Sequence, residues 1–92
     1  MTLKRLLDTL SKGEVARLTA AAWAKHEGEF LLEESHPTGV AGELRIGVIG
    51  DTRVAVEEAE PGLLAIRNLS SKIKAATFVK ERLAAYDRLW DG

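Results

Sequence analysis

The chain has 92 residues, of which 46% are hydrophobic and 29% are charged, with a net charge of −1 and no cysteine. These values are typical of one folded domain and exclude wholesale disorder, disulfides and thiolate chemistry. No apolar run is long enough to span a membrane, and the N-terminal residues lack the features of a secretory signal. We therefore expect a single cytoplasmic domain over residues 1–92. The absence of Gln fits a thermophilic source or a GC-rich genome equally well.

Charge is sorted along the chain into three blocks. Residues 1–26 carry five basic and two acidic side chains, residues 27–60 carry two basic and nine acidic ones, and residues 61–92 carry six basic and three acidic ones. The block boundaries coincide with changes in the hydrophobic period. The pattern therefore predicts basic helical ends around an acidic β centre.

Two helices are predicted in residues 1–28. The leucines at positions 3, 6, 7 and 10 share one helical face, and Thr2 is a suitable N-cap. Ser11-Lys12-Gly13-Glu14 matches the S-x-x-E capping box. A second helix from about residue 12 to about residue 27 is therefore expected, and the two helices would form a pair.

A meander of three or four antiparallel strands is predicted over residues 29–69. Residues 43–50 and 52–58 alternate between apolar and polar around Gly50-Asp51, which is a hairpin signal. Residues 29–35 form a further candidate strand, although Phe30-Leu31-Leu32 does not alternate. Residues 63–69 are either a strand or the start of a long helix. The strand is favoured because Ser70 and Ser71 are good N-caps for a helix that begins after them.

The apolar pattern also tests the register of the hairpin. A two-residue loop opposes Val48 to Arg53 and places Arg53 and Glu57 on the apolar face. A loop with an odd number of residues instead opposes Arg45 to Glu57 and leaves one face wholly apolar. A three- or five-residue loop, or a bulge near Asp51, is therefore predicted.

A long helix over residues 70–92, packed on the sheet, completes an α+β fold. Its apolar residues form two stripes, which together are wider than the face that a surface helix buries. In one interpretation one stripe meets the sheet and the other meets the N-terminal helices. In the other interpretation the stripe with Phe78 and Leu89 is an oligomer contact. Trp90 is a candidate exposed anchor, because Trp is enriched at interface hot spots.

No catalytic, cofactor or metal site is predicted. The two histidines, His26 and His36, have no set of further ligands at the spacing that zinc requires. No nucleophile, base and acid cluster in the sequence. We expect a non-enzymatic protein without a cofactor or a small-molecule ligand.

Protein–protein interaction is the function that the sequence favours, with a second copy of the chain as the partner. The acidic centre can pair with the basic helices of another copy, and such an oligomer weakens with salt. The interface candidates are the unpaired acids and the apolar residues of the last helix: Phe78, Leu89, Trp90, Glu33, Glu34, Glu58 and Glu60.

Two alternatives stay open. Residues 10–18 resemble the opening of many helix-turn-helix DNA regulators, and the hairpin would then be a wing, with Lys12, Arg17 and Lys25 as the DNA contacts. The acidic hairpin argues against this, because phosphate contacts need clustered Lys and Arg. A small inhibitor or accessory protein that acts through an acidic face is not distinguished from the first function by the sequence.

Overall fold

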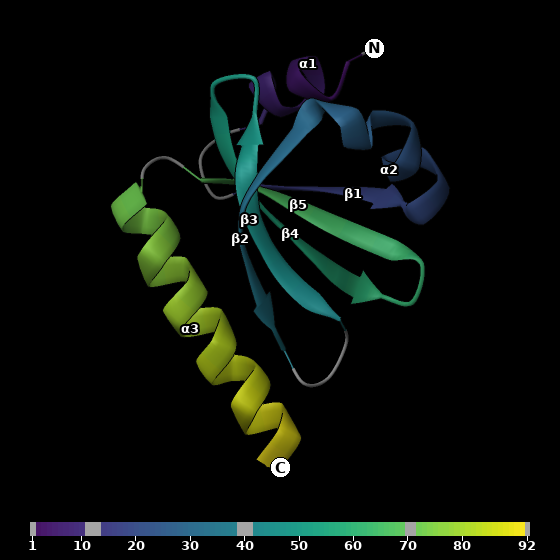
Figure 1. Ribbon diagram of the computed structural model, residues 1–92. Coiled ribbons are helices and arrows are strands. Elements are labelled where there is room, and N and C mark those ends of the chain that lie inside the picture. Colours follow the sequence, from purple (N-terminus) through teal and green to yellow (C-terminus); the bar gives the residue numbers. More distant parts are fainter. Residues whose placement is uncertain (1, 11–13, 39–41, 70–71, 92) are drawn as a thin grey trace.

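The computed structural model describes residues 2–10, 14–38, 42–69 and 72–91. The chain forms α1 (Leu3–Asp8), β1 (Val15–Thr19), α2 (Ala20–His26), the short 3-10 helix η1 (Glu27–Glu29), β2 (Phe30–Pro37), β3 (Glu43–Ile49), β4 (Thr52–Glu60), β5 (Leu63–Leu69) and α3 (Lys72–Asp91). The predicted α+β class is confirmed: an antiparallel sheet is accompanied by a C-terminal helix (Figure 1). The predicted strand number is wrong, because the sheet has five strands.

The predicted pair of N-terminal helices is also wrong. The first helix forms, and the Thr2 hydroxyl accepts a hydrogen bond from the Arg5 amide as an N-cap does. Residues 15–19, however, form strand β1, which pairs with β5 and buries Ala16. Thr19 ends this strand and caps α2, since its hydroxyl accepts from the Ala22 amide. Pairing with β5 makes residues 15–19 a strand, and the predicted second helix is restricted to the Ala-rich part of its range, Ala20–His26.

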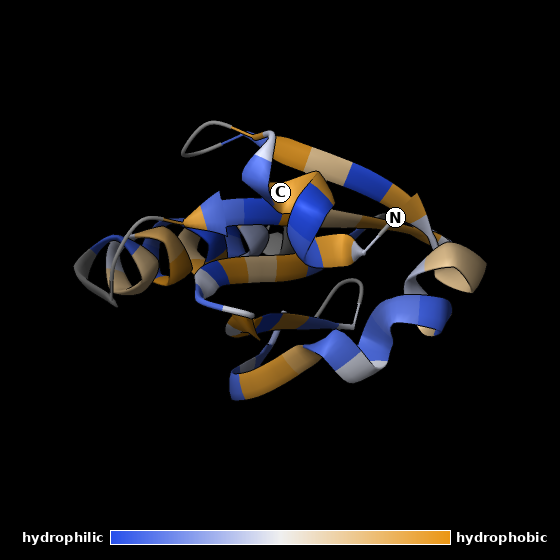
Figure 2. Ribbon diagram, turned by 90° about the horizontal axis from the view of Figure 1, so that it is seen from above, coloured by the Kyte–Doolittle hydropathy of each residue, from blue (hydrophilic) through white to orange (hydrophobic). Residues whose placement is uncertain are grey.

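The sheet has the order β1-β5-β4-β3-β2, and every neighbouring pair is antiparallel. Its central strands are buried on both faces. Because neighbouring strand residues point to opposite faces, Val54 and Val56 enter one apolar cluster and Ala55 enters another. The first cluster contains Trp23 of α2 together with Leu3 and Leu7 of α1, and its other buried members are Ile49 and Ile66. The second cluster contains Ala75 and Val79 of α3, and its other buried members are Leu44, Ile46 and Leu69. Helices therefore lie on both sides of the sheet (Figure 1), and apolar and polar residues alternate along its strands (Figure 2).

The two-sided core overturns the predicted hairpin register. The β3–β4 loop has only two residues, Gly50 and Asp51, so that Val48 opposes Arg53. Gly50 takes φ +66°, as the first central residue of a type II′ hairpin turn does. The prediction assumed that only one face is apolar. With both faces buried, a charge beside the apolar residues is acceptable when a neighbouring element pairs it.

Two such pairs form on the face that α3 covers. Arg53 bonds to Glu33 of β2, and Glu57 bonds to Arg82 of α3, with 2.8 Å between Glu57 Oε1 and Arg82 Nη2. Burial alone lowers the pKa of Arg82, but the hydrogen bonds and the charge of Glu57 outweigh burial, and the pKa lies above its ordinary value. The predicted pairing of Glu57 with Arg45 is wrong, since Arg45 opposes Val56.

The remaining strands and the last helix agree with the sequence. The favoured strand over residues 63–69 is confirmed as β5, and the candidate strand near residues 29–35 is confirmed as β2. The long C-terminal helix is confirmed as α3. Its proposed N-caps, Ser70 and Ser71, lie outside the described residues. Within the described residues, no helix combines the length and the apolar character that crossing a membrane requires.

Candidate protein-binding edge

The sheet is open at the outer side of β2. This strand is the last in the sheet order and pairs only with β3 among the described strands. The outer side of an edge strand presents main-chain N–H and C=O groups without ladder partners, which are a template for pairing with another chain. We call the outer side of residues 30–37 the β2 edge.

Two leucines make the β2 edge apolar near its start. Leu31 is 68% exposed and Leu32 is 53% exposed, and these are the large hydrophobic side chains that stay exposed among the described residues. Because neighbouring side chains of a strand alternate, each face of the sheet carries one of the two leucines at this edge. The sequence analysis did not select either residue. Phe30-Leu31-Leu32 does not alternate, but a continuous apolar run is typical of a strand buried on both faces, so this pattern did not indicate that Leu31 and Leu32 are exposed.

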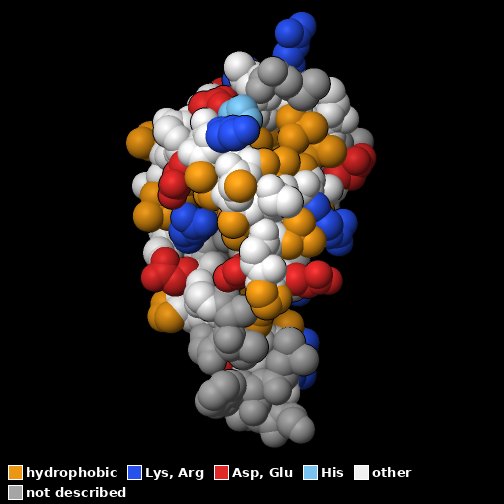
Figure 3. Space-filling view, turned by 90° about the vertical axis from the view of Figure 1, so that its right-hand side faces the viewer, with side chains coloured by type: hydrophobic (Ala, Val, Ile, Leu, Met, Phe, Trp, Pro, Cys, Tyr) orange, Lys and Arg blue, Asp and Glu red, His pale blue; other side chains and the backbone are white. Residues whose placement is uncertain are grey.

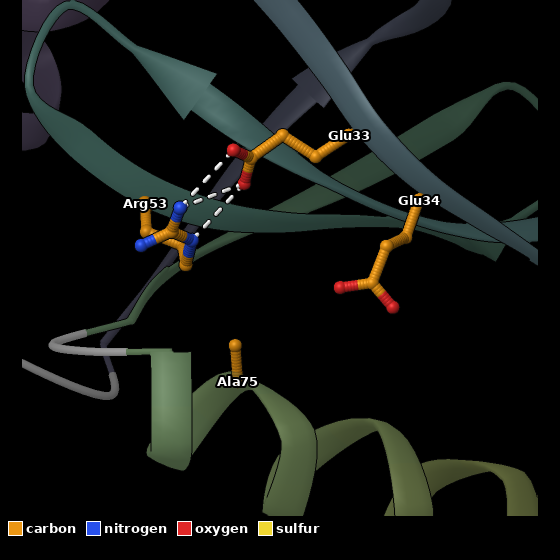
Figure 4. A pocket seen from close by; sticks show the side chains of 4 residues that line it. All are labelled: Glu33, Glu34, Arg53 and Ala75. Carbon is orange, nitrogen blue, oxygen red and sulfur yellow. Dashed lines mark hydrogen bonds and ion pairs between the residues drawn. The ribbon is translucent and has the colours of Figure 1, made fainter.

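A β-bulge follows the leucines and directs Glu33 toward β4. The pairing register with β3 shifts between Leu32 and Glu34, which leaves Glu33 as the extra residue. Its carboxylate accepts three hydrogen bonds from the Arg53 guanidinium, at 3.1 Å from Nε and at 2.8 and 3.1 Å from Nη2 (Figure 4). Such a forked arrangement matches the planar guanidinium to both carboxylate oxygens. The charge of Glu33 is therefore balanced within the molecule.

A hollow of about 210 Å³ lies beside this ion pair, between β2 and the first turns of α3. It is lined by Glu33, Glu34, Arg53 and Ala75. The carboxylate of Glu34 extends from β2 into the space above Ala75 (Figure 4). Its Oε1 lies 3.1 Å from Nε2 of His36, and the Glu34 side chain remains largely accessible to solvent. Since Arg53 balances Glu33, the second carboxylate leaves the hollow with a net negative charge when His36 is neutral.

The arrangement offers groups that bind and orient a chain. The β2 edge supplies main-chain donors and acceptors, the leucines supply apolar area, and Glu34 supplies a negative charge. Two other carboxylates of the acidic block are held in ion pairs away from the β2 edge: Asp51 lies 3.5 Å from Lys4, and Glu57 is bonded to Arg82. In the part of the chain that the structure describes, no three His, Asp or Glu side chains are grouped to hold a metal ion.

The structure separates the acidic interface candidates into two groups. Glu33 and Glu34 lie together at the β2 edge, whereas Glu58 and Glu60 lie near the turn between β4 and β5. Glu58 accepts a hydrogen bond from the amide of Gly62 within that turn. The acidic block of the sequence is therefore not one continuous acidic face.

The candidates on the last helix take different positions. Phe78 packs against the cluster under α3, and the Arg67 guanidinium carbon lies 5.2 Å from the centre of its ring. Phe78 is thus half-buried against the sheet, and Val79, which belongs to the other stripe, packs in the same cluster. The predicted contact of one stripe with the N-terminal helices is wrong, because α1 and α2 pack on the opposite face of the sheet. The side chains of Leu89 and Trp90 lie outside the described part of the structure.

The DNA-contact candidates do not share one helix. Arg17 lies on strand β1 and Lys25 lies on helix α2, while Lys12 falls outside the described residues. On the face that carries α2, Lys and Arg side chains are interspersed with acidic and apolar ones (Figure 3). Residues 15–18 of the segment that resembles a helix-turn-helix opening form part of strand β1, and the helix that follows, α2, has only seven residues.

Comparison of the chain with protein-family models, with curated proteins and with solved structures finds no match. The functional argument therefore rests on the geometry of the β2 edge.

Proposed function

We propose that this chain is a non-enzymatic protein–protein interaction module that binds through the β2 edge, and that its partner is a second copy of the chain. The observation that carries the proposal is the exposure of two successive leucines, Leu31 and Leu32, on a strand whose outer side has no partner among the described strands. Strand addition at an open sheet edge is a recurrent way of binding an extended chain, in which main-chain hydrogen bonds supply affinity and side chains supply specificity.

The two leucines favour association energetically. Fully burying a leucine side chain stabilises a structure by about 1.5–3 kcal/mol relative to leaving it in water. In the single chain more than half of the surface of Leu31 and of Leu32 is still exposed to water, so most of this stabilisation remains to be gained on association. A strand placed against the β2 edge covers both side chains, one on each face of the sheet.

Charge supports a second copy as the partner. The net charge of −1 produces little overall repulsion between copies, while the acidic and basic residues lie in separate blocks of the chain. An acidic edge on one copy can therefore meet a basic surface on another. Because such contacts are screened by salt, association is expected to be stronger at about 0.1 M salt than at about 1 M, where the Debye length falls from about 10 Å to about 3 Å.

Light scattering over a wide range of protein concentration, at both salt levels, tests the proposal. Wild type is expected to associate, and Leu31→Lys and Leu32→Lys are expected to weaken association without lowering the melting temperature, because both side chains are already exposed. Ala84→Lys, at an exposed position of α3, is the matched control and is expected to associate like wild type. A monomer under all conditions would contradict self-association. Leucine variants that associate like wild type would contradict the β2 edge as the site.

A further inference from the structure

The sheet has a second open edge, and this one carries a basic side chain. Strand β1 lies at the opposite end of the sheet order and pairs only with β5 among the described strands. Arg17, at the centre of β1, is exposed. It forms no ion pair with another residue of the described part of the chain.

The two open edges run in the same direction. Each step from β1 through β5, β4 and β3 to β2 is antiparallel, so four reversals separate the two edge strands. Strands β1 and β2 are therefore parallel to each other. A second copy placed beside the first by translation along the sheet would set its β1 parallel to β2 of the first copy.

The register places Arg17 and Glu34 on the same face of the sheet. Arg17 pairs with Ala65, which pairs with Glu57 on the face covered by α3. Glu34 pairs with Ile46, and Ile46 belongs to the cluster under α3. Side chains on directly opposed residues share a face, so both charged groups point to the α3 side.

The apolar residues of β1 and β2 also occupy corresponding faces of the sheet. Ala16 pairs with Ile66, and Leu32 pairs with Gly47, which itself opposes Val54. Ile66 and Val54 belong to the cluster that contains Trp23, so Ala16 and Leu32 lie on the face away from α3. Val15 and Leu31 lie on the α3 face, since each is the neighbour in sequence of one of those residues.

We propose that β1 of one copy adds in parallel to the β2 edge of the next, with Arg17 beside Glu34. The proposal rests on the function proposed above and identifies the surface that the β2 edge binds. In the matching register Val15 lies beside Leu31, and Ala16 lies beside Leu32. Arg17 then lies beside the bulge, where the hollow of about 210 Å³ has room for its guanidinium next to the Glu34 carboxylate.

Other pairings of two copies fit these charges less well. Pairing β2 with β2 about a two-fold axis brings Glu33 and Glu34 of both copies into one short ladder, and like charges on neighbouring strands are destabilising. An antiparallel pairing of β1 with β2 turns one copy over, so that Arg17 and Glu34 point to opposite faces. The parallel arrangement joins opposite charges and keeps each face of the sheet continuous.

Such a junction joins two different surfaces and leaves one edge free at each end. Contacts of this kind generate open chains of copies, or rings if the rotation closes, and they do not stop at a dimer by themselves. Because neighbouring strands twist by roughly 20–25°, successive copies are expected to rotate about the axis of the chain. The mean mass in solution should therefore rise steadily with concentration.

Exchange of the two charges tests the junction. Arg17→Glu and Glu34→Lys are each expected to raise the dissociation constant by about fivefold to tenfold, tenfold being about 1.4 kcal/mol. An equimolar mixture of the two variants is expected to associate like wild type, because every mixed junction again joins opposite charges. The double variant, with both changes in one chain, is expected to associate like wild type for the same reason. Circular dichroism and thermal melting check that each variant is folded.

Each contrary result has a distinct meaning. If Glu34→Lys weakens association and Arg17→Glu does not, β1 is not the partner strand, and the β2 edge remains the site. If both variants weaken association but neither the mixture nor the double variant restores it, the contact between Arg17 and Glu34 is wrong. A wild-type mass that stops at a dimer overturns the head-to-tail junction. A wild type that stays monomeric overturns both proposals of self-association.

Discussion

Replacing Arg82 with methionine tests how α3 is held on the sheet. Glu57 is buried, with a side chain only 10% exposed, and its carboxylate is bonded to Nε and Nη2 of Arg82 at 3.2 and 2.8 Å. Arg82→Met leaves this carboxylate beside apolar side chains without its partner. Removing one member of a fully buried ion pair costs about 3–5 kcal/mol. Because the Arg82 side chain is 35% exposed, water reaches the site, and we expect a cost of about 2 kcal/mol.

Thermal and urea unfolding measure this cost. For a domain of this size, a loss of about 2 kcal/mol lowers the melting temperature by roughly 8–16 °C. The double variant Glu57→Leu with Arg82→Met removes both charges, and it is expected to lie within about 1 kcal/mol of wild type, because hydrophobic replacement of a buried ion pair is often neutral or stabilising. This recovery distinguishes an unpaired buried charge from a simple loss of packing.

Arg45→Met is the matched control. The Arg45 guanidinium lies 3.9 Å from Glu27 and about 6 Å from the rings of Trp23 and Phe30, so its loss is expected to cost less than about 1 kcal/mol. If Arg45→Met costs as much as Arg82→Met, the ion pair between Glu57 and Arg82 is not a special contribution to stability. If the double variant is as unstable as the sum of its single variants, the hairpin register that buries Glu57 beside Arg82 is refuted.

Two further substitutions test the strand next to the open edge and the docking of α1, whose Leu3 amide donates a hydrogen bond to Oε1 of Glu29 at 3.2 Å. Gly47→Ala places a methyl group against the carbonyl oxygen of Leu31 and 2.6 Å from the ring of Phe30. A destabilisation of about 1–3 kcal/mol is expected, with amide exchange increasing first in β2; unchanged protection of β2 would argue against this close approach. The hydrogen bond from His26 holds the pKa of Glu29 below its ordinary value of 4.5. The stability that Glu29 contributes is therefore present above about pH 4.5 and is lost as the pH falls through its lower folded-state pKa. Acid unfolding should be steeper for wild type than for Glu29→Gln, and parallel curves would contradict this role.

Elements with strong local signals were predictable from the sequence. The Thr2 cap and the leucine spacing specify α1, and period-two alternation specifies β3 and β4. The turn between β4 and β5 has a local signal of the same kind, because Pro61 and Gly62 are the residue types that a type II turn favours at its two central positions, and Gly62 takes the required positive φ of +80°. In each case the deciding interaction lies within a few residues of the signal.

Strand β1 and the hairpin register were not predictable by the same means. The residues of β1 stand between a capping-box pattern and the Ala-rich start of α2, which together favour one long helix, and their strand conformation depends on β5, about fifty residues away in sequence. The predicted register of the β3–β4 hairpin depended on how many faces of the sheet are buried. A single apolar face was assumed, and only the packed structure shows that α3 supplies Arg82 as the partner of Glu57 on the second face.

At the β2 edge, too, some features were predictable from the sequence and others depended on tertiary packing. The sequence by itself determined the acidic centre and the basic ends, and it selected Glu33 and Glu34 as interface candidates, because charge and local pattern can be read along the chain. Only the tertiary structure decided that β2 is an outermost strand, that Leu31 and Leu32 stay exposed there, and that Arg53 balances Glu33 while Glu34 faces an open hollow. The physical reason is that strand order, sheet edges and long-range ion pairs are properties of how distant segments pack, and no local signal encodes them.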